Sequence, residues 1–308
     1  MITEEILTEC RKHGNECGLK IAPVYGNKAG IVTVISDDGN FETSGKLNAL
    51  SKETQIPITV AGVVQNVAPH EEHWKNLLAE GNLELINHSY SHYRMDENWA
   101  DCAKKESYVH EIIDAKRYFA TLGCPTDVFV CPENILTELG NTVLKENAFK
   151  AVRRGNRGHN SLDPQPGTEP GNWLHLQCFG MMDVPAPGKT REQTRAGWVE
   201  GACEGKWLVE MWHNIDVNGY QTVSYDEARG HLYQIAAHKD ELWCTHFSKA
   251  VRYLWAKQHA ALYSCKEDGA VCLCVLVDDK DVADTTELTV LLGDGKQCNV
   301  RVNRVYKL

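Results

Sequence analysis

The sequence lacks any run of about 18 consecutive apolar residues, the length that a helix needs to cross a bilayer. It also lacks an excess of positive charge, because 32 Lys and Arg stand against 42 Asp and Glu and the net charge is -10 at pH 7. Nucleic acids and anionic lipids are bound by clustered Lys and Arg. We therefore expect no membrane-spanning segment and neither nucleic acid nor membrane as a partner, and we expect neutral or cationic ligands.

Residues 1–18 contain no apolar core of a secretory signal. The 12 cysteines do not suggest a disulfide framework, because Cys131 and Cys244 lie within apolar runs where a thiol behaves as a small hydrophobe. Cys272 and Cys274 form a C-x-C, but a zinc ribbon needs a second cysteine pair with C-x-x-C spacing, so we expect both in a strand. These features predict a reduced, cytoplasmic setting.

Strand-like and helix-like segments alternate from residue 31 to residue 260. Strands are expected at 31–36, 57–64, 83–87, 128–131, 150–153, 173–179, 207–211 and 241–247, and helices at 44–54, 71–80, 103–121, 136–147, 190–203, 225–238 and 248–260. Such alternation is typical of a parallel sheet, and about seven or eight βα units suit a barrel better than an open sheet. The predicted fold is therefore α/β, a distorted (β/α)7-8 barrel.

Two further regions flank the predicted barrel, which is expected over residues 30–261. Apolar residues at helical spacing predict a short amphipathic helix at 2–13, within an N-terminal cap formed by residues 1–29. Residues 262–308 contain strand-like runs split by polar turns, which predict a small antiparallel β appendage. Because exposed strand edges must be covered, we expect the appendage to pack on the barrel or to pair across a homodimer.

The segment IVTVISDDGN, residues 31–40, is the first candidate for chemistry. Its five leading apolar or β-branched residues are typical of a strand that is covered on both faces. The strand is followed by Asp37 and Asp38, and Gly39 permits a tight turn. An Asp-Gly pair often does no more than open a loop. However, successive side chains of an extended chain point in opposite directions, so one carboxylate can hold a cation while the other accepts a proton.

Polar residues also follow three other predicted strands, at the face of the barrel where active sites lie. His88 and His92 come after the strand at 83–87 and stand four residues apart, so they face one centre if the segment turns helically. With a strand-end Asp they would make a set of three metal ligands that leaves positions open for water and substrate. The other two strand ends carry Pro132, Glu133 and His213.

In this order the segments IVTVISDDGN, NHSYSH, VFVCPEN and WLVEMWHNI resemble the polysaccharide deacetylase family, which is carbohydrate esterase family four. The resemblance covers roughly residues 28–262. It implies a barrel that binds one divalent ion, expected to be zinc, and removes acetyl groups from an acetylated carbohydrate. Carried over residue by residue, it implies Asp37 as the general base, His213 as the general acid, and Asp38, His88 and His92 as the metal ligands.

The same resemblance implies roles for residues around this set. The backbone N–H of Glu133 matches the donor to the oxyanion, and Met211 stands where a Leu usually lines the pocket for the acetyl methyl group. Pro132 and Asn134 belong to the same motif as Glu133 and are expected to line the substrate site. Asp183 is the candidate for the carboxylate that orients the acid.

The sequence departs from the family at the third motif. Many members have an Arg two residues before the Pro, where it orients the base, but this chain has Val130 there. Arg153 or Arg154 could take its place in space. The usual Tyr-Gly after the Pro is replaced by Glu133-Asn134, which puts a carboxyl group at the mouth of the barrel and leaves the choice of substrate open.

The function that these residues favour is metal-dependent deacetylation, with N-acetyl groups expected over O-acetyl groups. An allantoinase-like amidohydrolase for small cyclic amides is an alternative on the same scaffold. A catalytically silent carbohydrate-binding module is an alternative of another class. The presence of a base, a ligand set and an acid favours the enzyme.

Overall fold

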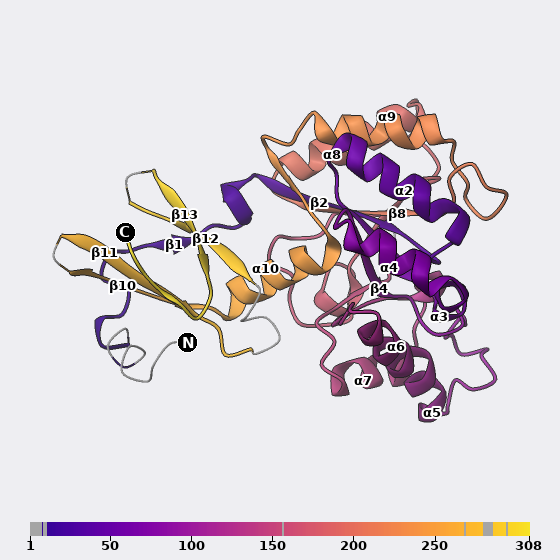
Figure 1. Ribbon diagram of the computed structural model, residues 1–308, viewed down its shortest axis with the longest axis horizontal. Helices are drawn as coiled ribbons and strands as arrows, with labels where there is room; N and C mark the ends of the chain where they lie inside the picture. Colours follow the sequence, from indigo (N-terminus) through magenta and orange to yellow (C-terminus); the bar gives the residue numbers. More distant parts are fainter. Residues whose placement is uncertain (1–7, 9–10, 156, 268, 280–285, 294) are drawn as a thin grey trace. The chain divides into compact units, whose positions relative to one another are not determined.

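The computed structural model of the protein describes residues 8, 11–155, 157–267, 269–279, 286–293 and 295–308. The chain divides into two compact units (Figure 1). The barrel unit holds residues 29–248, and the β unit combines the described residues up to 28 with those from 249 onward. The helix predicted at 2–13 lies mostly outside the described residues.

A parallel sheet of eight strands forms the centre of the barrel unit. The strands are β2 (Gly30–Ser36), β3 (Ile58–Gly62), β4 (Leu83–Asn87), β5 (Val128–Val130), β6 (Ala151–Arg153), β7 (Phe179–Gly180), β8 (Trp207–Trp212) and β9 (Leu242–Cys244). Their order is β6-β5-β4-β3-β2-β8-β7, and β9 pairs with the first residues of β2. The sheet curls into the distorted (β/α) barrel predicted from the sequence, with β6 and β7 at its two ends.

Helices connect these strands. They are α2 (Phe41–Thr54), α3 (Val64–Val67), α4 (Glu71–Ala79), α5 (Lys105–Tyr108), α6 (Ala115–Thr121), α7 (Glu138–Glu146), α8 (Arg191–Cys203), α9 (Tyr225–Ala236) and α10 (Phe247–His259). Several begin at a residue whose side chain accepts a hydrogen bond from the first turn, as Asn40, Thr137, Thr190 and Ser224 do for α2, α7, α8 and α9. Such caps satisfy backbone donors that have no partner within the helix.

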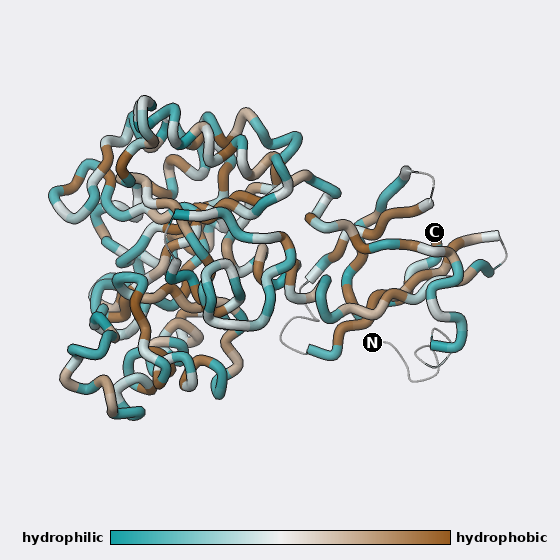
Figure 2. Tube along the Cα trace, turned by 180° about the vertical axis from the view of Figure 1, so that it is seen from behind, coloured by the Kyte–Doolittle hydropathy of each residue, from teal (hydrophilic) through white to brown (hydrophobic). Residues whose placement is uncertain are grey.

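The core lies between the central strands and the surrounding helices. All seven residues of β2 are buried, which is why its sequence shows no alternation of apolar and polar residues. Leu47 and Leu50 of α2 and Leu232 of α9 belong to the same buried cluster as Val32 and Val34 of β2. Figure 2 shows hydrophobic segments inside the barrel unit and mostly hydrophilic segments along its outer turns.

The structure corrects the sequence prediction at three places. The expected strand at 173–179 is a short 3-10 turn, Trp173–His175, followed by a loop and the two-residue strand β7. Its apolar side chains are buried all the same, because Trp173, Leu174 and Leu176 pack into the core. The strand expected at 241–247 is only Leu242–Cys244, and the helix expected at 103–121 contains a π-helical segment, Val109–Asp114.

The β unit contains two antiparallel three-stranded sheets. One has the order β1-β12-β13 and the other β10-β11-β14. The strands are β1 (Lys20–Ile21), β10 (Ala261–Glu267), β11 (Ala270–Leu276), β12 (Glu287–Leu291), β13 (Gln297–Arg301) and β14 (Val305–Lys307). Cys272 and Cys274 both lie on β11. Because β1 pairs with β12, the segment that precedes the barrel shares a sheet with the end of the chain.

Among the described residues, no helix has both the length and the apolar character that crossing a membrane requires.

The backbone carbonyl groups that pack against Gly30 of β2 provide a stability test. A Cβ atom on Gly30 would collide with the carbonyl oxygen of Ala202 and come within 2.6 Å of that of Lys206. We predict that Gly30→Ala lowers the free energy of unfolding by about 1–3 kcal/mol, the usual effect of overpacking. Gly45, an exposed residue in α2 with nothing within 4 Å of its Cβ position, is the matched control.

Replacing Gly45 by Ala should raise the stability by about 0.5–1 kcal/mol, because Gly is a poor helix former. Urea denaturation of both variants measures the difference. A Gly30→Ala protein as stable as the original chain would show that α8 does not press on β2 as described.

Candidate functional site

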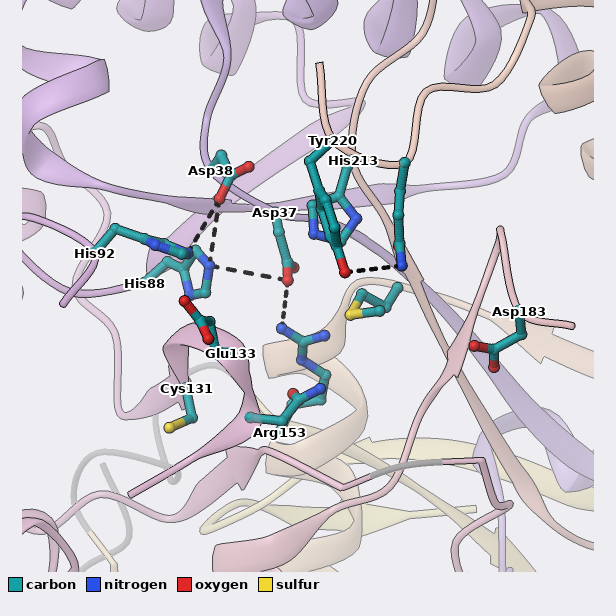
Figure 3. A pocket seen from close by; sticks show the side chains of 13 residues that line it. Asp37, Asp38, His88, His92, Cys131, Glu133, Arg153, Asp183, His213 and Tyr220 are labelled. Carbon is teal, nitrogen blue, oxygen red and sulfur yellow. Dashed lines mark hydrogen bonds and ion pairs between the residues drawn. The ribbon is translucent and has the colours of Figure 1, made fainter. Parts of the chain in front are cut away.

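The segments that follow the central strands converge on one cavity of about 560 Å³ (Figure 3). They come after β2, β4, β5 and β8, and Arg153 at the end of β6 joins them. The cavity is lined by Asp37, Asp38, His88, His92, Cys131, Glu133, Asn134, Arg153, Asp183, Met211, His213, Tyr220 and Gln221. The structure therefore brings together most of the residues proposed from the sequence, and it places Pro132, which is buried, in the turn beside Glu133.

The two adjacent carboxylates after β2 point to different partners. Asp37 is 4% exposed and its backbone N–H donates to the carbonyl of Trp212, which continues the pairing of β2 with β8. Asp38 has a φ of 74°, in the left-handed region, so the chain turns away from the strand at this residue. Figure 3 shows Asp37 directed toward Arg153 and Asp38 toward His88 and His92, and His88 Nε2 also lies 3.9 Å from Asp37 Oδ2.

Arg153 holds Asp37 in place. The guanidinium is fully buried, and its Nη2 donates to Asp37 Oδ2 at 2.5 Å. Its neighbour Arg154 is engaged elsewhere, because it donates to Asn141 Oδ1 and to the carbonyl of Leu136. Of the two arginines proposed from the sequence, the structure therefore places Arg153 beside the carboxylate, and it does so from β6 rather than from β5.

The second oxygen of Asp37 faces a different environment. Oδ1 is buried and makes no hydrogen bond with any described residue. A buried carboxylate oxygen without a donor is costly unless a ligand supplies one. Asp37 thus offers one oxygen to Arg153 and keeps the other available as a proton acceptor.

Asp38, His88 and His92 form a group of donors suited to a metal ion. Asp38 Oδ1 lies 3.6 Å from His88 Nε2 and 3.4 Å from His92 Nε2, and the three ligand atoms all lie within 4.8 Å of one another. His88 Nδ1 is 2.8 Å from the carbonyl oxygen of Val130. Since a carbonyl can only accept, Nδ1 carries the proton and the lone pair of Nε2 is left for a ligand. This donor set fits a divalent ion such as zinc.

Burial and neighbouring charges set the protonation states of Asp38 and His92. Burial raises the pKa of Asp38, but the imidazoles of His88, His213 and His92 outweigh burial and hold this pKa at about 2. Burial, and next the charge of His88, lower the pKa of His92. Near neutral pH the carboxylate is therefore ionised and the His92 imidazole is neutral, which are the forms that bind metals.

The loop that carries the two histidines is not the helical turn that the sequence suggested. Ser89 and His92 have positive φ angles, 74° and 61°, and the loop bends irregularly. Its strain is offset by hydrogen bonds from buried side chains, because Asn87 Oδ1 accepts from Ser89 N and Glu111 accepts from Ser91. The histidines still reach one centre, but through left-handed residues rather than through helical spacing.

The turn after β5 places Glu133 and Asn134 in the lining of the cavity. Glu133 and Asn134 both have positive φ, 51° and 59°. The backbone N–H of Asn134 donates to the carbonyl of Cys131, and that of Ile135 donates to Pro132, so the turn is closed on itself. The carboxylate of Glu133 is about half exposed and pairs with Arg94 Nη1 at 2.8 Å. The charge expected at the mouth is therefore largely balanced.

His213 follows β8 on the other side of Asp37. Ser36 Oγ donates to the carbonyl of His213, and the imidazole meets the ring of Tyr220 edge-on with centroids 5.0 Å apart. Burial lowers the pKa of His213, while Asp37 and Asp38 act in the opposite direction. A lowered pKa makes the imidazolium a stronger acid, and the carboxylates of Asp37 and Asp38 favour its protonated form.

Sequence comparison agrees with this geometry. Residues 26–152 match the sequence model of the polysaccharide deacetylase family. The resemblance to that family is confirmed. The matched residues include Asp37-Asp38, His88 to His92 and Pro132, on which the resemblance was based. No curated protein matches the sequence.

Solved structures share the fold. A Mycobacterium smegmatis protein described as a polysaccharide deacetylase is similar with a TM-score of 0.54 and 11% identity, over 78% of this chain and 95% of that one. A mutant of a pseudoenzyme of carbohydrate esterase family four, with restored enzymatic activity, is similar with a TM-score of 0.50 and 10% identity, over 75% of this chain and 72% of that one. At these identities the likeness concerns the polysaccharide deacetylase fold alone.

One residue proposed from the sequence lies in the cavity but away from its expected partner. Asp183 Oδ2 accepts from the backbone N–H of Gly180 at 3.0 Å and lies 3.6 Å from Arg157 Nε. His213 Nδ1 is buried and makes no hydrogen bond with any described residue, so Asp183 does not orient it through that atom.

The sequence reading missed Tyr220, Gln221 and Cys131 as lining residues. Tyr220 directly follows the Asn-Gly turn after His213, and a turn signal of this kind beside a candidate acid marks a loop that can reach the site.

The contact between Arg153 and Asp37 can be tested by stability. We predict that Arg153→Met lowers the free energy of unfolding by about 3–5 kcal/mol, because it leaves a buried carboxylate without its cation. Arg154→Met is the matched control, since Arg154 binds neutral oxygen atoms only. It should cost about 0.5–2 kcal/mol, as expected for lost hydrogen bonds.

The double variant Arg153→Met/Asp37→Asn should recover part of the lost stability, because no charge is then stranded. Urea denaturation of the four proteins measures this coupling. Additive losses from Arg153→Met and Asp37→Asn would show that the two side chains do not depend on each other.

Proposed function

We propose that the protein is a metal-dependent hydrolase that removes acetyl groups, N-acetyl rather than O-acetyl, from a carbohydrate. The observation that carries this proposal is the division between the two neighbouring carboxylates: Asp37 pairs with buried Arg153, and Asp38 meets the two imidazoles. The match of residues 26–152 to polysaccharide deacetylases supports it.

Asp38, His88 and His92 would hold one divalent ion, for which zinc is our proposal. When bound, such an ion supplies Lewis-acid chemistry, because it lowers the pKa of water and polarises a carbonyl group. The three side chains leave further positions for water and substrate, as in other catalytic sites with three protein ligands.

Asp37 acts as the general base in this proposal. Its Oδ1 accepts a proton from the water that attacks the acetyl carbon. Arg153 fixes the direction of the carboxylate through Oδ2. Arg153 thereby orients the base, although Asp37 directly precedes the proposed ligand Asp38 in the chain.

Glu133 and His213 stabilise the oxyanion and protonate the leaving group in this proposal. The backbone N–H of Glu133 donates to the oxygen that becomes negative when water adds to the carbonyl, and the closed turn holds this donor in position. His213 then gives a proton to the departing nitrogen as the C–N bond breaks, and the electron pair of that bond stays on the nitrogen. The products are acetate and a free amine.

The wall of the cavity suits a sugar ring. Met211 provides an apolar surface for the acetyl methyl group, and the ring of Tyr220 lies edge-on to His213 at the rim. Tyr220 is 67% exposed, so its face is open to stacking against the apolar face of a sugar. A cavity of about 560 Å³ is of the size that holds a small ligand or a short part of a longer one.

The alternatives weighed from the sequence are less well supported. A silent binding module would not need a buried base oxygen or a prepared set of metal ligands, both of which are present. An allantoinase-like amidohydrolase acting on small cyclic amides would use the same scaffold. Assay of acetate release from acetylated saccharides, beside hydrolysis of cyclic amides, distinguishes the two enzymes.

The first functional test separates the adjacent carboxylates. We predict that Asp37→Asn keeps the metal while kcat falls by a factor on the order of 10² to 10⁴, the usual contribution of a positioned base. Asp38→Asn should weaken metal binding, and the double variant His88→Ala/His92→Ala should bind one fewer zinc ion while its circular dichroism is unchanged.

Metal analysis of the purified variants and acetate release from N-acetylated oligosaccharides are the measurements. An Asp37→Asn enzyme that is fully active with its metal bound would refute the role of Asp37. Unchanged zinc content in the double histidine variant would place the ligands elsewhere.

The second functional test concerns the acid. We predict that His213→Ala loses most activity on acetamides, whose nitrogen must be protonated to leave, and least on activated aryl acetates, whose leaving group needs no proton. The ratio of kcat/KM for the two substrates measures the effect. Tyr220→Phe, which keeps the ring beside His213 but removes its hydroxyl, is the control and should leave the ratio nearly unchanged. An equal loss on both substrates in His213→Ala would argue for a binding role instead.

A further inference from the structure

A second group of metal-binding side chains lies in the barrel unit, apart from the cavity. Cys203 is the last residue of α8, His238 lies in the turn after α9, and Glu241 precedes β9. One ligand atom from each lies within 4.8 Å of the other two. These residues stand next to the first residues of β8 and β9, whereas the cavity lies where the strands end, so the group belongs to the opposite face of the barrel.

The spacing of the donor atoms suits a bound ion. Cys203 Sγ is 3.6 Å from His238 Nδ1, and His238 Nδ1 is 3.2 Å from Glu241 Oε1. Around a tetrahedral zinc ion, bond lengths of about 2.0 to 2.3 Å place neighbouring ligand atoms about 3.3 to 3.8 Å apart. The observed distances are already close to that range.

His238 Nδ1 cannot serve both of its neighbours through hydrogen bonds at once. In a neutral imidazole, His238 Nδ1 is either a donor or an acceptor. As a donor it satisfies Glu241 but offers no acceptor to the thiol of Cys203. As an acceptor it can accept a hydrogen bond from the thiol of Cys203. Its lone pair then also faces the carboxylate of Glu241, with no proton between the two. A cation between the three atoms serves all of them at once.

The backbone around the group is fixed. Glu241 N and Leu242 N both donate to the carbonyl of His238, which closes the turn that carries two of the three ligands. The carbonyl of Glu241 accepts from Ala29 N at the foot of β2. On the other side, Lys206 N donates to the carbonyl of Ala202, directly before Cys203. The ligands therefore project from anchored segments.

The surroundings of the sulfur are negative. The carboxylates of Glu241 and Glu200 lie near the thiol of Cys203. Lys206, three residues after Cys203, is paired with Glu204 at 2.9 Å. A negative environment favours a bound divalent ion.

We propose that Cys203, His238 and Glu241 form a second metal site, which takes a borderline-soft divalent ion such as zinc and ties the end of α8 to the turn before β9. One thiolate, one imidazole and one carboxylate are all zinc ligands, and a thiolate selects against magnesium and calcium. Binding replaces the thiol proton by the ion, and the proton is released to solvent. The fourth position is left for water. The site is structural, because it lies away from the cavity.

Cobalt(II) is the probe that separates this site from the first one. A cobalt–thiolate bond gives a charge-transfer absorption band in the near ultraviolet, and the group of Asp38, His88 and His92 has no sulfur ligand. We predict that the full chain develops this band as cobalt is added and that zinc abolishes it by displacement. The His88→Ala/His92→Ala variant should keep the band.

Cys203→Ser should lose the band. Cys272→Ser is the matched control, because Cys272 also lies beside a carboxylate, Glu267, and this variant should keep the band. A chain that shows no band, or a band that survives Cys203→Ser, would overturn the proposal.

A second pair of variants keeps the test valid if Cys203→Ser does not fold. Glu241→Gln should raise the cobalt concentration needed for half of the band, and Glu204→Gln, which removes a nearby carboxylate that is paired with Lys206, should leave it unchanged. Zinc should raise the melting temperature of the His88→Ala/His92→Ala protein and should no longer do so when Glu241→Gln is added. Equal behaviour of the two glutamate variants would overturn the proposal.

Discussion

The buried contact between Arg153 and Asp37 is the interaction on which the rest of the site depends. Two carboxylates in adjacent positions repel each other and would compete for the same cation. Here the fully buried guanidinium takes Oδ2 of Asp37, and His88 Nε2 lies nearer to Asp38 Oδ1, at 3.6 Å, than to Asp37 Oδ2, at 3.9 Å. Without this contact, neither a separate base nor a separate ligand could be assigned at this strand end.

The backbone conformation of the segments that follow the strands also directs side chains to different partners. Asp38, Ser89, His92 and Glu133 all adopt positive φ, which is unfavourable for residues other than glycine. Each such residue costs about 1–3 kcal/mol and is kept only where neighbouring bonds fix it. At Ser89 such a bond comes from the buried side chain of Asn87, and the buried Glu111 fixes the neighbouring Ser91. The rigid strands thus supply position, and the strained segments after them supply direction.

The sequence was sufficient to predict the parallel barrel and most residues of the cavity, because β2 reads as a fully buried strand and polar residues follow it at regular places. It could not predict the left-handed bend at Ser89, since spacing in sequence does not reveal φ. It also could not predict whether Arg153 or Arg154 pairs with Asp37. The two side chains point to opposite sides at the end of β6, and packing decides which of them faces Asp37. By its place in the sequence Asp183 was the candidate to orient His213, but its carboxylate accepts a hydrogen bond from the backbone N–H of Gly180.

Anomalous X-ray diffraction at the zinc edge, on crystals of the zinc-loaded protein, tests whether the two carboxylates have separate roles. We predict a peak within bonding distance of Asp38 Oδ1, His88 Nε2 and His92 Nε2, with Asp37 still paired to Arg153 and outside that distance. A peak bonded to Asp37, or no peak in the cavity, would contradict the division of the two carboxylates into base and ligand.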